Sequence, residues 1–83
     1  MKLLYFAWLR AKIGAADEEV SLPADVADVG GLIDWLKTRG PGYAEALANP
    51  EVVRVAVNHE YVGRDHALAA NDEVALFPPV TGG

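Results

Sequence analysis

The chain of 83 residues contains no cysteine. This absence excludes disulfide bonds, thiolate nucleophiles and cysteine-ligated metal sites, so the fold must be held by packing alone or by a partner. Histidine is scarce as well, with only His59 and His66. Both fall in predicted turns, where a solvated side chain is the more common outcome than a metal ligand. We therefore predict no metal site.

Positive charge is in deficit, because seven Lys and Arg stand against twelve Asp and Glu and give a net charge of −5. Nucleic acid is a poor partner for such a chain, since that binding depends on neutralising phosphates. The negative net charge is compatible with docking onto a basic protein surface. No segment reaches the roughly 20 apolar residues of a membrane span, and the first residues lack a signal-peptide cleavage site. We expect a cytoplasmic protein that binds neither nucleic acid nor membrane.

Catalytic motifs are also missing. The hydroxyl residues Ser21 and Thr81 have no nearby base in the sequence. The glycine pair Gly30 and Gly31 opens a predicted helix but lacks the other residues of a phosphate-binding loop. We expect no bound cofactor, no ATP site and no catalytic side chain in this chain.

Hydrophobic patterning predicts two strands at the start of the chain. Residues 2–9 are apolar at nearly every position, which is typical of a central strand covered on both faces. Leu4, Phe6 and Trp8 would share one of these faces. Residues 18–22 alternate and predict a second strand, which would pair with the first as a hairpin.

One main helix is predicted over residues 28–39. Its apolar residues recur at helical spacing, Asp28 is a suitable N-cap, and Gly40 and Pro41 stop it. A short second helix is predicted at residues 43–48. The remaining strands are predicted at residues 53–57, 61–62 and 73–77.

The first and last strands are the two with apolar residues on both faces. We expect them to lie side by side and parallel in the middle of a mixed sheet, with the main helix across one face. This α+β arrangement is the β-grasp of ubiquitin-like domains. The other face would then carry an exposed apolar patch, which on a small domain favours a protein partner. The alternative is that loops and the short helix cover it.

The chain ends in the sequence FPPVTGG. Pro78 and Pro79 cannot continue a strand ladder and favour an extended polyproline conformation. We therefore divide the chain into a domain at residues 1–77 and an extended arm at residues 78–83. Such an arm would project about 20 Å from the domain.

Gly82 and Gly83 leave the terminal carboxylate without side-chain hindrance. One interpretation is that this carboxylate is the reactive group, carried by the arm into the narrow site of another protein. A carboxylate must first be activated, and another enzyme would have to do this. The other interpretation is an unimportant frayed end.

Three segments, LLYFAWLRAKIG, VAVNHEYV and DEVALFPPVTGG, resemble the ubiquitin-like sulfur carriers. This family includes the small subunits of molybdopterin synthase and the thiamine-pathway carrier. The similarity runs over essentially the whole chain, and its most specific part is the strand leading into FPPVTGG. The resemblance implies a non-catalytic, sulfur-carrying subunit of a sulfurtransferase complex.

The resemblance further implies that a ubiquitin-activating-like adenylyltransferase uses ATP to convert Gly83 into a glycyl adenylate and then a thiocarboxylate, or 1-thioglycine. The arm would insert into the large subunit of molybdopterin synthase, in a heterotetramer of two small and two large subunits. There the sulfur passes to cyclic pyranopterin monophosphate in molybdenum cofactor biosynthesis. The inserted residues are Pro78, Pro79, Val80, Thr81 and Gly82.

We predict partner binding at Phe77, where the last strand becomes the arm, at Phe6 and Trp8 on the uncovered face, and at Arg10. Arg10 matches an arginine that follows the first strand in such carriers. Asn71 departs from the glycine common in the family, but asparagine tolerates the left-handed backbone of a tight turn. The alternatives left open are a sulfur carrier for thiamine or another thio-compound, a ubiquitin-like protein modifier, and a plain binding module.

Overall fold

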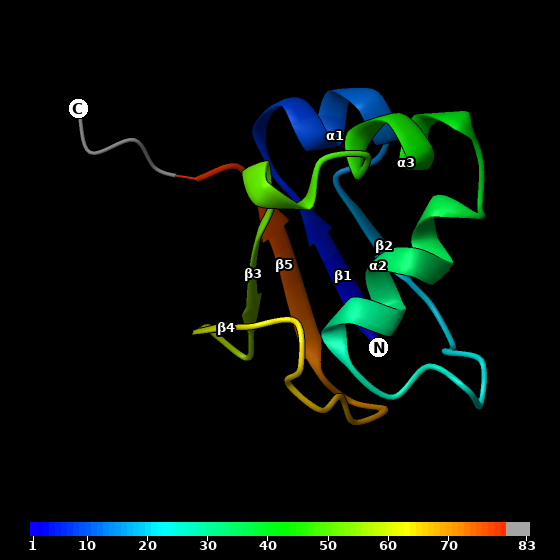
Figure 1. Cartoon of the computed structure of the whole chain (residues 1–83), viewed down its shortest axis with the longest axis vertical. Coiled ribbons are helices and arrows are strands. Elements are labelled where there is room, and N and C mark those ends of the chain that lie inside the picture. Colours follow the sequence, from blue (N-terminus) through cyan, green and yellow to red (C-terminus); the bar gives the residue numbers. More distant parts are fainter. Residues whose placement is uncertain (80–83) are drawn as a thin grey trace.

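A computed structural model gives the structure of residues 1–79 (Figure 1). Its five-stranded mixed sheet has the order β2-β1-β5-β3-β4. The strands are β1 (Lys2–Tyr5), β2 (Asp17–Glu19), β3 (Arg54–Val57), β4 (Glu60–Val62) and β5 (Glu73–Phe77). The helices are α1 (Ala7–Ile13), α2 (Val29–Lys37), α3 (Pro41–Ala46) and the 3₁₀-helix η1 (Pro50–Val52). Within residues 1–79, none of these helices is long and apolar enough to cross a membrane.

The first and last strands are the central neighbours, as the sequence predicts. β1 and β5 run parallel, with Leu3 opposite Val74 and Tyr5 opposite Leu76. β2 pairs antiparallel with β1 and completes the predicted hairpin. In Figure 1 the arrowheads of β1 and β5 point to the same end of the molecule, where the arm leaves the sheet. The predicted ubiquitin-like β-grasp is confirmed.

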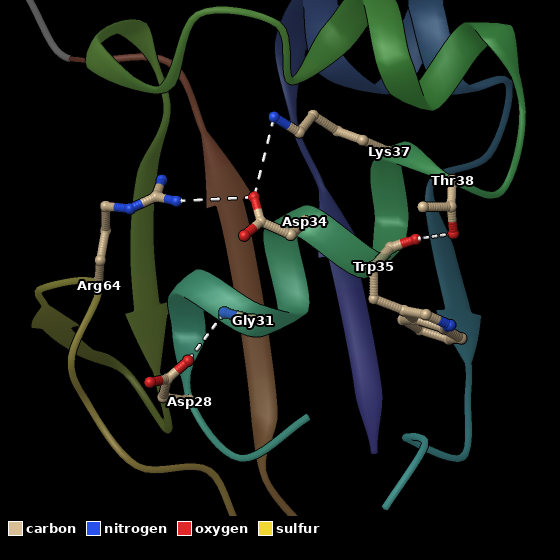
Figure 2. Close-up of polar contacts among 7 residues, drawn as sticks. All are labelled: Asp28, Gly31, Asp34, Trp35, Lys37, Thr38 and Arg64. Atoms are coloured by element: carbon tan, nitrogen blue, oxygen red, sulfur yellow. Dashed lines mark hydrogen bonds and ion pairs between the residues drawn. The ribbon is translucent and has the colours of Figure 1, made fainter. Parts of the chain in front are cut away.

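The core lies between one face of the sheet and α2. The apolar stripe of this helix, which includes Leu32 and Leu36, is fully buried against the inward residues of the central strands. Figure 2 shows the predicted cap: the Gly31 backbone N–H donates to the Asp28 carboxylate at 2.8 Å. Burial of these apolar side chains is the main stabilising term of the fold, because each Å² of apolar surface removed from water contributes about 25 cal/mol.

The predicted strand over residues 2–9 is wrong beyond Tyr5. Phe6 still donates its N–H to the Leu76 carbonyl, but Ala7 has a positive φ of 55° and turns the chain into helix α1. The turn places Leu9 in the core, where it is fully buried. An apolar run of this length fits either element by pattern alone, and the helix is favoured by good helix formers and by Gly14, which ends it in the left-handed conformation.

The sequence predicted one short helix, at residues 43–48, but the structure has two short helices, α1 and α3. α3 begins two residues earlier than predicted and packs on α1. A Cβ built on Gly42 would lie 2.5 Å from the Lys12 carbonyl oxygen, so the close approach of the two helices requires glycine here. The Lys12 ammonium and the Glu45 carboxylate join the same two helices at 2.6 Å.

A polar cluster joins the β1–β2 hairpin to α3 and to the segment that follows α2. The hydroxyls of Tyr5 and Tyr43 donate to the same oxygen of Glu18, at 2.6 and 2.7 Å. The Arg39 guanidinium donates to the other oxygen at 3.0 Å. The same guanidinium lies over the rings of Tyr43 and Trp35, at 5.1 and 5.2 Å from their centroids. This cluster connects the β1–β2 hairpin to the helices on the same side of the sheet.

The cluster keeps Glu18 ionised. Burial raises the pKa of this carboxyl, but the tyrosine hydrogen bonds and the charge of Arg39 outweigh it, so the pKa lies below its usual value. Burial, and then the hydrogen bond to Glu18, raise the pKa of both Tyr5 and Tyr43. Because the folded pKa of Glu18 is depressed, its stabilising effect is present above the unfolded pKa and is lost as pH falls through the folded value.

Replacing Glu18 by Gln should destabilise the fold by about 1–3 kcal/mol at pH 7, because an ionised acceptor for three donors is lost. Urea unfolding should show this difference at pH 7 and a much smaller one near pH 3, where the wild-type carboxylate is increasingly protonated. The matched control is Glu60→Gln on the exposed edge of β4. A difference between wild type and Glu18→Gln that stays constant over this range would contradict the electrostatic account.

Candidate docking surface and the base of the arm

The sheet face opposite α2 carries a row of small and apolar residues. Strand register aligns Leu4 of β1, Ala75 of β5, Ala56 of β3 and Tyr61 of β4. Ala56 is buried beneath its neighbours, but Tyr61 is 80% exposed. The row ends on an aromatic ring that is held at the surface of an edge strand.

Two further aromatic residues lie where the central strands end. Phe6 directly follows β1 and is 47% exposed, and Phe77 is the last residue of β5 and is half-buried. The rings of Phe77 and Tyr61 are in contact, with centroids 5.5 Å apart. We call Leu4, Phe6, Tyr61, Ala75 and Phe77 the docking surface. Exposed apolar side chains gathered on one face of a small domain mark a protein interaction site.

The arm begins at the edge of the docking surface. Pro78 and Pro79 directly follow β5, and both are half-buried. Pro79 and Phe77 border an open groove of about 490 Å³, whose other lining residues are Arg54, Val55, Tyr61, Val62 and Gly63. The groove opens because β4 ends at Val62, while its partner β3 extends as far as Arg54. A partner that bound the arm would therefore meet the groove and the docking surface together.

The other predicted site residues lie on α1 or in the arm. Trp8 is 37% exposed, and Arg10 is exposed near the end of the helix. Trp8 was expected on the uncovered sheet face with Phe6, but the turn at Ala7 places it on α1 instead. Val80, Thr81, Gly82 and Gly83 lie outside the described residues.

Tyr61 and Arg54 are site residues that sequence reasoning missed. The sequence placed Tyr61 only in a short strand and did not place Arg54 beside the arm. An aromatic residue on a short edge strand was the available signal for Tyr61. Nothing local indicated Arg54, because its position follows from the pairing of β3 with β5, which sets Arg54 opposite Phe77.

The histidines lie apart on the surface. Both side chains are exposed, and His59 Nε2 lies 3.3 Å from a Glu73 carboxylate oxygen. Among residues 1–79, no three His, Asp or Glu side chains gather as a metal ion would require.

The N-terminus of α2 has its first N–H groups occupied by the protein itself. Val29 donates to the His66 carbonyl at 3.1 Å, and Gly30 donates to the Arg64 carbonyl at 2.8 Å. With Gly31 bonded to Asp28, these groups are not free to bind a phosphate.

Comparison with known proteins places this geometry in a family. The model described as the ThiS family matches residues 3–83. The chain belongs to the ThiS family. Among its relatives is the molybdopterin synthase sulfur carrier subunit of Escherichia coli strain K12, which is 40% identical over 100% of this chain and 99% of that protein.

Solved structures of the family share the fold. SAMP1 from Haloferax volcanii superposes with a TM-score of 0.74 at 34% identity, over 100% of this chain and 98% of that chain. A Pyrococcus furiosus protein assigned as molybdopterin converting factor, subunit 1, gives a TM-score of 0.78 at 34% identity, over 95% of each chain. The matches therefore include relatives named as sulfur carrier subunits and a solved structure named SAMP1.

Proposed function

We propose that this chain is the sulfur carrier subunit of molybdopterin synthase and that the carboxylate of Gly83 carries the sulfur. The observation that carries the proposal is the end-to-end match to the Escherichia coli subunit of that name. The family match also extends to residue 83, so it includes the glycine pair.

The docking surface supports binding to a protein partner. Its aromatic side chains, Phe6, Tyr61 and Phe77, are exposed or half-buried and lie beside the base of the arm. In this proposal the large subunit of molybdopterin synthase covers the docking surface while the arm enters its active site. Trp8 and Arg10, which are exposed on α1, would contact the same partner. Anchoring the domain in this way positions the end of the arm, which is the main requirement of a carrier.

The chemistry of the proposal takes place at one carbonyl carbon. An adenylyltransferase of the ubiquitin-activating kind joins the Gly83 carboxylate to the α-phosphate of ATP and releases pyrophosphate. A sulfide equivalent (HS⁻) then attacks the acyl carbon and displaces AMP, which leaves a thiocarboxylate. In the large subunit this sulfur passes to cyclic pyranopterin monophosphate. Glycine suits the attack on the acyl carbon because no Cβ blocks the carbonyl.

A second candidate is a protein modifier that joins its terminal glycine to lysine side chains. The observation that favours it is the match to a structure from Haloferax volcanii entitled small archaeal modifier protein 1, at a TM-score of 0.68 and 28% identity. Activation by adenylation serves both functions, but the acceptor differs. A carrier ends as a free thiocarboxylate, whereas a modifier ends in an isopeptide bond.

The mass of the intact chain isolated from its own cells distinguishes the two. A carrier should show a species about 16 Da heavier than the unmodified chain, the difference between sulfur and oxygen. A chain with an amidated C-terminal glycine, made by chemical ligation and incubated with ATP in an extract of the same cells, should not form this species. If the chain is found only unmodified, or only in covalent conjugates with other proteins, the carrier function is wrong.

A further inference from the structure

Arg54 is a cation beside the docking surface, and at the other end of β5 the same face carries Glu73, which is paired with His59. Arg54 is the first residue of β3, lies directly opposite Phe77 in the sheet register, and points to the same face as the docking surface. It lines the groove at the base of the arm together with Tyr61 and Pro79. Its neighbours along the strand, Val55 and Ala56, are buried, whereas Arg54 is exposed.

Arg54 has no carboxylate partner within residues 1–79. The ion pairs of that part of the chain engage Lys12, Lys37, Arg39, Arg64 and His59 instead. An unpaired guanidinium is well solvated while the groove is open to water. Covering the groove would remove that water, and a charge buried without a partner is strongly destabilising.

We propose that Arg54 determines partner specificity by receiving a carboxylate side chain from the protein that covers the docking surface. The inference rests on the proposed function, since it assumes that the large subunit is that protein. A planar guanidinium offers several N–H donors in a fixed fork, so a carboxylate of an Asp or Glu can bind two of them at once. Such a pair would fix the register of docking beside the arm.

The sign of the charge makes this contact selective. The chain as a whole carries a net charge of −5 and would attract a basic surface. A partner carboxylate facing Arg54 would therefore be a local acidic group within a partner surface that is otherwise expected to be basic. A partner with a basic or apolar residue there would leave Arg54 buried without an acceptor, so it would be rejected.

Arg64 provides a matched control for the test. Figure 2 shows it on the helix side of the sheet, where its guanidinium approaches Asp34 of α2 at 3.9 Å. Its side chain is 51% exposed, and Asp34 also lies 3.8 Å from Lys37. Arg64→Gln therefore changes the net charge by the same amount as Arg54→Gln, away from the docking surface.

The experiment measures binding of the full chain to the purified large subunit of molybdopterin synthase by calorimetry, at about 50 and 300 mM salt. Arg54→Gln should weaken binding at least about tenfold at low salt and reduce the salt dependence, because a charged pair is lost. Arg54→Lys should recover part of the affinity, since it keeps the charge but not the fork. Arg64→Gln should stay within about twofold of the unmodified chain.

Unfolding in urea first establishes that the variants are folded. If the unmodified chain binds and Arg54→Gln binds equally well, the inference is wrong while the proposed function stands. If Arg64→Gln is weakened as much as Arg54→Gln, net charge rather than a local pair controls affinity, which also overturns the inference. If the unmodified chain does not bind the large subunit, the proposed function fails and the inference fails with it.

Discussion

Replacing Phe77 by Ala should weaken binding to the large subunit by about 1–3 kcal/mol, or roughly 5- to 150-fold, as expected for a buried aromatic anchor. Phe77 is the residue at which β5 becomes the arm, and its ring contacts Tyr61 on the docking surface. Truncation removes apolar contact and also leaves Tyr61 without its aromatic neighbour. Calorimetric titration of the folded variant with the large subunit measures the effect.

The control for Phe77→Ala is Leu68→Ala. Leu68 is also partly buried against the core, but it lies in the loop before β5 rather than on the docking surface. Its replacement should cost stability and leave affinity unchanged when binding is measured well below the unfolding temperature. If both variants bind as tightly as the unmodified chain, the sheet face is not the contact with this partner.

The central architecture could be predicted from the sequence because its signals are strong and local. β5 has the predicted bounds, Glu73–Phe77, and it pairs with β1 as the doubly apolar pattern of both segments required. The apolar stripe of α2 and its Asp28 cap were equally clear, because both patterns depend only on residues within two turns of the same helix.

The errors arose where tertiary contacts decide between local alternatives. Residues 7–9 continue an apolar run, and only the turn at Ala7 and the burial of Leu9 against the core make them helical. The Glu18 cluster was also invisible, since its donors lie 13, 21 and 25 residues away in sequence. The position of Arg54 depends on strand pairing in the same way.

Two parts of the chain have separable tasks in this account. The docking surface supplies affinity, and the arm supplies the reactive carboxylate. Phe77 and Pro79 stand at the junction, since both line the groove beside Arg54. Changes on the sheet face should therefore alter binding first, whereas changes at the glycine pair should alter transfer with binding preserved.

Deleting Gly83 should abolish sulfur transfer without unfolding the chain. The change shortens the arm by about 3.4 Å, so the carboxylate of Gly82 would fall short of the active sites of both the activating enzyme and the large subunit. Displacements of even about 1 Å can lower a rate about a hundredfold. The domain at residues 1–77 and its docking surface are unaltered, so association with the large subunit should stay close to normal.

The most direct measurement of the central claim is the rate of molybdopterin formation by the chain without Gly83, with purified activating enzyme and large subunit. His66→Ala serves as the control, because this exposed side chain lies in a loop away from the arm. We expect a rate within a few-fold of normal for His66→Ala and no detectable product for the deletion, although the shortened chain still binds. A normal rate from the shortened chain would contradict the claim that Gly83 carries the sulfur.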